Sequence, residues 1–231
     1  MIVDSTRVDP AAVDPAAVDP TPVVLLHGLA RTQLSMAGMA RFLRQHGFTT
    51  WMRTYPSRRL PVVQLAEIVA EWIRADHGDQ PVHVVTHSLG GILVRHMAER
   101  VPLSRVVMLA PPNTGSALAG ALRDFGPFSL LYGPAGQDVA TAQRRPVPSA
   151  PTAVIAGTRA TSFGNPISWL SGGLQVFGAD RPNDGTVAVD ETHLPGMTDF
   201  AEVDTSHTWI MNDPRVRAMT LRFLREERLI A

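Results

Sequence analysis

The chain has 231 residues, of which 45% are hydrophobic and 18% are charged, a composition that suits one substantial domain with a well-buried core. Its 21 basic and 21 acidic residues balance to a formal net charge of zero, so we expect no electrostatic attraction to nucleic acid. Cysteine is absent, which excludes disulfides, thiolate metal sites and a cysteine nucleophile. No signal-peptide pattern and no run of about 18 apolar residues occurs, so we expect a cytoplasmic protein with no membrane span.

The first 20 residues differ from the rest of the chain. They contain VDPAAVDPAAVDP, a five-residue repeat in which each proline fixes φ and removes a hydrogen-bond donor. We interpret residues 1–20 as an extended tail that serves as a linker, spacer or docking strand. Residues 21–231 are then expected to form the folded domain.

Apolar runs and segments of helical periodicity alternate through that domain. Strands are predicted at 22–28, 48–54, 82–87, 104–110, 152–157 and 200–204. Helices are predicted at 32–46, 62–75, 89–100 and 214–229. This alternation predicts an α/β fold, a doubly wound and mostly parallel sheet with helices on both faces.

Two stretches interrupt the alternation. Residues 111–150 are rich in Pro, Gly and Ala with a short helix expected near 116–124, and residues 158–183 are rich in Gly. Long insertions of this kind are often functional, so either stretch could form a lid or cap over a site. Plain surface loops are the alternative interpretation.

The segment VVTHSLGG places Ser88 between an apolar strand and a helix-like segment. A serine at such a sharp strand-to-helix turn can act as a nucleophile, provided that its neighbours two residues away are small. Gly90 and Gly91 meet this requirement, whereas Thr86 stands where the usual pattern has glycine. The alternative role for Ser88 is a helix N-cap.

A nucleophilic serine also needs oxyanion donors. The earlier strand ends in His27-Gly28-Leu29, and the glycine allows this loop to turn back beside the nucleophile. We therefore assign the oxyanion role to the backbone N–H groups of Leu29 and Leu89. His27 is expected to brace the loop by a hydrogen bond rather than to act as a base.

The base is sought among eight histidines. His207 follows the last predicted strand in DTSHTWIM and so is expected at the carboxyl edge of the sheet, where Ser88 would lie. His87 is interpreted as the variable residue of the turn, and His83 as a packed strand residue. The sequence therefore favours His207 as the general base.

The acid is expected in the segment RPNDGTV. Asp184 precedes Gly185 in a tight turn, where backbone N–H groups can surround the carboxylate and keep it ionised. Asp180 remains an alternative, and a purely structural turn is another. Asp190, Asp199 and Asp204 are less well placed relative to His207.

These segments together resemble lipases and esterases of the α/β-hydrolase superfamily, in particular compact bacterial members. The similar segments are LLHGLA, HSLGG, LAPPNTGS, PNDGTV and the late SH. The resemblance implies the order nucleophile Ser88, acid Asp184 and base His207, with Leu29 as an oxyanion donor suited to medium and longer acyl chains. Thr208-Trp209 stands where some related lipases carry a calcium-binding aspartate, so no metal and no other cofactor is expected.

The expected function is a serine carboxylester hydrolase that acts through an acyl-enzyme on Ser88, with a small-molecule acyl ester or lipid as its substrate. An acyltransferase would use the same triad, and an amidase or peptidase is also compatible with it. A non-catalytic binding protein built on a hydrolase fold is the remaining alternative.

Overall fold

The computed structural model describes residues 20–122, 126–139, 147–161, 176–178 and 180–230. A six-stranded sheet in the order β2-β1-β3-β4-β5-β6 runs through them, and every neighbouring pair of strands is parallel. The strands are β1 (Val23–Leu26), β2 (Thr50–Trp51), β3 (Val82–His87), β4 (Leu103–Leu109), β5 (Thr152–Gly157) and β6 (Asp199–Val203). The predicted α/β fold with a parallel sheet is confirmed.

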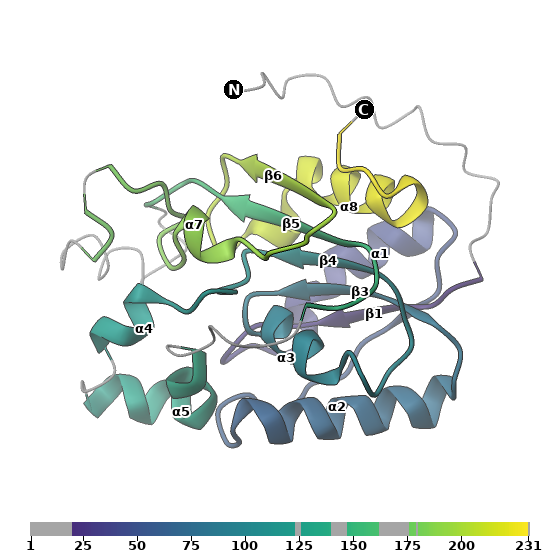
Figure 1. Ribbon diagram of the computed structural model, residues 1–231, viewed down its shortest axis with the longest axis horizontal. Coiled ribbons are helices and arrows are strands. Elements are labelled where there is room, and N and C mark those ends of the chain that lie inside the picture. Colours follow the sequence, from purple (N-terminus) through teal and green to yellow (C-terminus); the bar gives the residue numbers. More distant parts are fainter. Residues whose placement is uncertain (1–19, 123–125, 140–146, 162–175, 179, 231) are drawn as a thin grey trace.

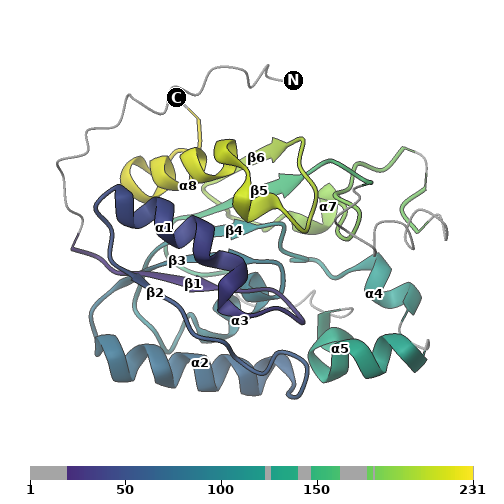
Figure 2. The same ribbon diagram turned by 180° about the vertical axis from the view of Figure 1, so that it is seen from behind.

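Helices cover both faces of this sheet, as predicted (Figures 1 and 2). One face carries α1 (Ala37–Gln45) and α8 (Pro214–Glu226), and the other carries α2 (Val62–His77) and α3 (Leu89–Met97). The shorter elements are η1 (Gln33–Met36), α4 (Ala117–Leu122), α5 (Gly126–Val139), α7 (Val189–Thr192) and η3 (Ile210–Asn212). Among the described helices, none is long and apolar enough to cross a membrane.

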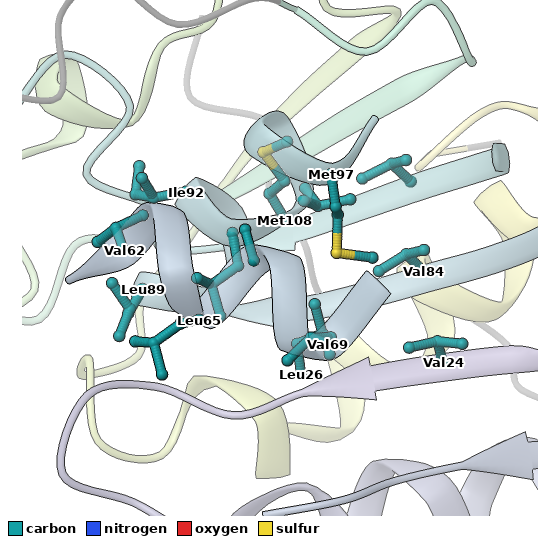
Figure 3. Packing of buried hydrophobic residues seen from close by; sticks show 14 of the residues in the cluster. Val24, Leu26, Val62, Leu65, Val69, Val84, Leu89, Ile92, Met97 and Met108 are labelled. Atoms are coloured by element: carbon teal, nitrogen blue, oxygen red, sulfur yellow. The ribbon is translucent and has the colours of Figure 1, made fainter. Parts of the chain in front are cut away.

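Burial on both faces explains why the strands appear as continuous apolar runs in the sequence. Side chains of a strand alternate between the two faces, and both faces of this sheet are covered. In β1, Val24 and Leu26 join the cluster beneath α2 and α3, whereas Val23 and Leu25 join the cluster beneath α1 and α8. Figure 3 shows the first cluster, in which aliphatic side chains of the strands meet those of the two helices.

The strand order defines a switch point between β1 and β3. The chain runs from β1 to its neighbour β2 on one side and from β3 to its neighbour β4 on the other, so the connections after β1 and β3 leave in opposite directions. In open α/β sheets, ligands bind outside the carboxyl ends of the strands at such a switch point. Figures 1 and 2 show α4, α5 and α7 beyond this same edge.

Some element boundaries differ from the prediction. The strand expected at 48–54 shrinks to the two residues of β2, which lies at the sheet edge and pairs with β1 alone. Within 111–150, α4 matches the expected short helix, but α5 was not predicted because Gly and Pro interrupt it. At Gly133 the backbone has φ of 63°, and a Cβ there would lie 1.9 Å from the carbonyl oxygen of Arg58.

Part of the predicted organisation lies outside the described residues. This applies to residues 1–19 of the predicted tail and to most of the predicted insertion at 158–183. The structure therefore does not test the lid interpretation of that insertion.

A pair of glycine substitutions tests how tightly α3 packs on the sheet. A Cβ at Gly90 would lie 2.9 Å from the carbonyl oxygen of Leu26, whereas a Cβ at Gly120 in α4 meets nothing within 4 Å. Alanine improves helix propensity by about 1 kcal/mol at either position. We expect Gly120→Ala to raise the free energy of unfolding by up to ~1 kcal/mol and Gly90→Ala to lower it by about 1–3 kcal/mol.

Urea denaturation of both variants against the unmodified protein measures this difference. An equal gain in stability for the two variants would contradict the close packing of α3 on β1.

Candidate active site

Ser88 lies at the sharp turn between β3 and α3. Its backbone has φ of 50° and ψ of −117°, a strained conformation for a residue other than glycine that costs on the order of 1–3 kcal/mol. The Ser88 N–H donates to the carbonyl oxygen of Leu109 at 2.9 Å, which ties the turn to β4. Ser88 is half-buried while His87 and Leu89 on either side are buried, so the turn presents this one residue at the sheet edge.

The small residues around the turn have a steric role. A Cβ at Gly91 would lie 2.8 Å from Cβ of Pro111, and a Cβ at Gly90 would lie 3.2 Å from Cβ of Thr86. Thr86 takes the position of the first glycine in the usual pattern because it is an extended strand residue and Gly90 leaves room for its side chain. The departure from the sequence pattern is therefore accommodated.

Asp184 and His207 form a buried pair at the same edge. The Nδ1 atom of His207 is 2.7 Å from Oδ2 of Asp184, and both side chains are more than nine-tenths buried. The backbone N–H of His207 donates to the carbonyl oxygen of Asp184 at 3.1 Å, so side chain and backbone are both fixed. With Nδ1–H donated to the carboxylate, Nε2 is the ring atom left to accept a proton.

The turn that follows Asp184 stabilises its carboxylate. Oδ1 accepts hydrogen bonds from the N–H groups of Thr186 at 3.0 Å and Val187 at 2.8 Å. Gly157 at the end of β5 makes the arrangement sterically feasible, because a Cβ there would lie 2.8 Å from Cβ of Asp184.

The other aspartates considered from the sequence are engaged elsewhere or exposed. Asp190 pairs with Arg181 at 2.9 Å and Asp204 pairs with Arg159 at 3.0 Å. Asp199 starts β6, at the opposite edge of the sheet, and accepts the N–H of Leu229. Asp180 is exposed. Of the five candidates, Asp184 is the one that contacts His207.

The loop after β1 is held by His27, as the sequence predicted. His27 Nδ1 lies 2.8 Å from the carbonyl oxygen of Gly28, and its Nε2 accepts the N–H of Tyr55 at 3.2 Å. The rings of His27 and Tyr55 stack with their centroids 3.8 Å apart, and the Tyr55 hydroxyl donates to the carbonyl oxygen of His27. Burial lowers the pKa of His27 to about 4, which keeps this brace neutral.

The same loop packs against the turn that carries Ser88. A Cβ at Gly28 would lie 2.7 Å from Nδ1 of His87 and 3.4 Å from Cβ of Ser88. Leu29 follows immediately, and Leu89 is the first residue of α3, where a backbone N–H has no acceptor within the helix. Both proposed oxyanion donors thus belong to residues adjacent to this contact.

Glu191 is a supporting residue that the sequence did not single out. Its buried carboxylate accepts the N–H groups of Ala117 at 2.7 Å and Ala188 at 3.0 Å, and Arg181 lies 3.3 Å away. It thereby joins the segment after β4 to the segment that carries Asp184. Burial raises the pKa of this carboxyl. The bond to Ala117 spans 74 residues of sequence, so no local pattern reveals that Glu191 joins these two segments.

Within the described ranges, no group of three or more His, Asp or Glu side chains is arranged to hold a metal ion. The candidate site comprises Ser88 at the turn after β3 and the hydrogen-bonded Asp184–His207 pair.

The fold and this arrangement define a hydrolase-type α/β protein. The chain belongs to the α/β hydrolase fold family, whose model matches residues 21–156. A comparison with curated proteins found no significant match.

Several solved structures share the fold. The mature form of a lipase from Bacillus licheniformis is 21% identical, with a TM-score of 0.72 over 95% of this chain and 97% of that chain. Phospholipase PlaB from Legionella pneumophila is 17% identical, with a TM-score of 0.67 over 90% of this chain and 59% of that chain. A metagenomic carboxyl esterase is 19% identical, with a TM-score of 0.65 over 84% and 66% of the two chains. At these sequence identities, the structural similarity shows that the fold is shared.

The low pKa of His27 predicts how stability depends on pH. Its pKa is about 4 in the folded protein and about 6.5 in an unfolded chain, so between these values the unfolded state binds more protons. The free energy of unfolding should therefore fall as pH falls through this window, by roughly 3 kcal/mol in total from this group.

Urea denaturation at several pH values from 7 to 4 measures the effect, with His27→Gln as the comparison. The variant is less stable at pH 7 because it loses the brace, but its stability should decline less steeply. An equally steep decline would mean that His27 is not the buried neutral group.

Proposed function

We propose that the protein is a serine carboxylester hydrolase with Ser88 as nucleophile, His207 as general base and Asp184 as the orienting acid. The observation that carries the proposal is the buried 2.7 Å contact between His207 Nδ1 and Asp184 Oδ2, at the sheet edge where the strained turn presents Ser88. A carboxylate in this position fixes the imidazole tautomer and stabilises the imidazolium that forms during reaction.

Acylation of the enzyme follows from these roles. Ser88 Oγ attacks the ester carbonyl carbon while His207 Nε2 takes the hydroxyl proton. The carbonyl electron pair moves onto the oxygen, which accepts hydrogen bonds from the N–H groups of Leu29 and Leu89. When the tetrahedral intermediate collapses, the carbon–oxygen bond to the alcohol breaks and the His207 imidazolium protonates the leaving oxygen.

Deacylation repeats the sequence with water. His207 Nε2 accepts a proton as water attacks the acyl carbon, and the acid product leaves as Ser88 Oγ is protonated again. Water is the acceptor in this proposal. If most of the acyl-enzyme transferred its acyl group to an added alcohol instead of to water, the protein would be an acyltransferase.

The proposed substrate is a small-molecule acyl ester or lipid. Support comes from structural relatives whose names are lipase, phospholipase and carboxyl esterase. A single backbone N–H after His27-Gly28 as oxyanion donor resembles lipases of medium and longer acyl chains. A series of p-nitrophenyl esters of graded chain length determines the preferred acyl length.

Covalent labelling tests the nucleophile. A fluorophosphonate should form an adduct on Ser88, located by peptide mass spectrometry, because only an activated serine displaces fluoride readily. Ser88→Ala should abolish labelling and lower kcat on the order of 10⁶-fold if the triad acts as a unit.

Ser35→Ala is the control, since Ser35 lies in η1 and bonds to the carbonyl oxygen of Thr32. It should label and hydrolyse esters as the unmodified protein does. An adduct on another serine, with Ser88 unmodified, would refute the assignment.

Two aspartate substitutions test the acid. Asp184→Asn should lower kcat by up to about 10⁴-fold, because the amide no longer holds the productive imidazole tautomer. Asp180→Asn, four residues earlier on an exposed position, should keep near-native activity. Circular dichroism checks that both variants fold. The reverse pattern of losses would place the acid at Asp180.

A further inference from the structure

His87 links two loops of the proposed site that lie 120 residues apart. Its imidazole is fully buried directly before Ser88, and its Nε2 lies 3.0 Å from the backbone carbonyl oxygen of His207. The two histidine rings are 4.8 Å apart between centroids, with 50° between their planes. The side chain thus extends from the nucleophile turn to the loop that carries the proposed base.

The partners of His87 define its protonation state. A carbonyl oxygen can only accept, so Nε2 carries the proton and donates. Nδ1 is buried, has no hydrogen-bond partner among the described residues, and faces Gly28, where a Cβ would approach it to 2.7 Å. Burial first, and the neighbouring His207 second, lower the pKa of His87 well below 6.5. The ring is therefore a neutral donor with one defined tautomer.

The hydrogen bonds of His207 show what this donor contributes. Two of them, from Nδ1 to Oδ2 and from N–H to the carbonyl oxygen, attach the base to Asp184. The third, at the carbonyl of His207, comes from His87. The first two fix the base relative to the acid. Within the described part of the chain, the third is the hydrogen bond that fixes the base loop relative to the nucleophile turn.

We propose that His87 is a positioning residue whose Nε2–H holds the backbone of His207 so that its imidazole faces Ser88. This inference rests on the proposed function, because the orientation of His207 toward Ser88 matters only if Ser88 is the nucleophile. The hydrogen bond between His87 and His207 does not depend on that function. Misplacing a catalytic group by about 1 Å can cost on the order of 10²-fold in rate, so a tie between base and nucleophile has a measurable effect.

The chemistry of imidazole suits this position. His207 becomes cationic while Ser88 attacks, and a second cation 4.8 Å away between ring centroids would oppose that charge in a buried site. A neutral imidazole donates a hydrogen bond without adding charge. Its flat ring also fits under Gly28, so one side chain contacts the oxyanion loop, the nucleophile turn and the base loop.

Two substitutions separate the hydrogen bond from the packing. His87→Phe keeps an aromatic ring but removes the donor, whereas His87→Gln keeps an N–H at a similar reach. His83→Gln is the matched control, because His83 is also buried in β3 but packs near Phe48. Thermal unfolding of each variant reports whether it is folded.

Steady-state hydrolysis of a p-nitrophenyl ester and the rate of fluorophosphonate labelling at Ser88 are the activity readouts. We expect His87→Phe to lower kcat and the labelling rate by about 100-fold with KM changed less than threefold. His87→Gln should recover at least a tenth of the native kcat, and His83→Gln should stay within threefold of it. A folded His87→Phe with near-native kcat, or a loss confined to KM, overturns the proposal.

Nuclear magnetic resonance of the imidazole nitrogens gives a readout that does not depend on ester hydrolysis. In the unmodified protein at pH 7, His87 should be protonated at Nε2 and unprotonated at Nδ1. The Nδ1 proton of His207 should exchange faster with solvent in His87→Phe than in His87→Gln.

A doubly protonated His87, or equal exchange in the two variants, overturns the proposal even if esters are hydrolysed. Conversely, an unmodified protein that neither hydrolyses esters nor labels at Ser88 refutes the proposed function. The nitrogen spectra still decide whether His87 positions His207.

Discussion

Parallel alignment of the strands is the constraint on which the whole site depends. Because all six strands run in one direction, their carboxyl ends meet at one edge of the sheet. The His27-Gly28-Leu29 loop follows β1, Ser88 follows β3, and His207 follows β6. Asp184 reaches the same edge because Gly157 at the end of β5 leaves space for it. Residues up to 180 positions apart in sequence therefore converge at this edge.

Close packing holds the strained turn at that edge. The conformation of Ser88 is unfavourable by itself, and it persists because Gly90 and Gly91 let α3 approach β1 and Pro111 within van der Waals distance. A hydrogen bond to Leu109 adds a tie to β4. Rigid surroundings of this kind keep a nucleophile oriented before substrate binds, so less reorganisation is needed during the reaction.

Much of this arrangement could be predicted from the sequence, because the signals were local. The strands at 82–87 and 152–157 have the predicted bounds, since both are apolar runs buried on two faces. The Asp184-Gly185 pair is a local turn signal, and two backbone N–H groups of that turn donate to the Asp184 carboxylate as expected. The helix α5 and the roles of Glu191 and His87 were missed. Proline and glycine interrupt α5. Glu191 reaches Ala117 across 74 residues of sequence and His87 reaches His207 across 120, and no local pattern predicts such long-range contacts.

The distribution of charge around the three site histidines follows from their partners. His27 and His87 bond to backbone groups and are buried, and desolvation lowers the pKa of both, so each stays neutral. His207 alone among the three contacts a carboxylate. Protonating His87, whose ring centroid is 4.8 Å from that of His207, would place a second cation beside the base as it gains its proton, and the buried carboxylate of Asp184 could then offset only one of the two charges. Burial of two histidines and pairing of the third therefore direct positive charge to the one ring that the proposed reaction requires to carry it.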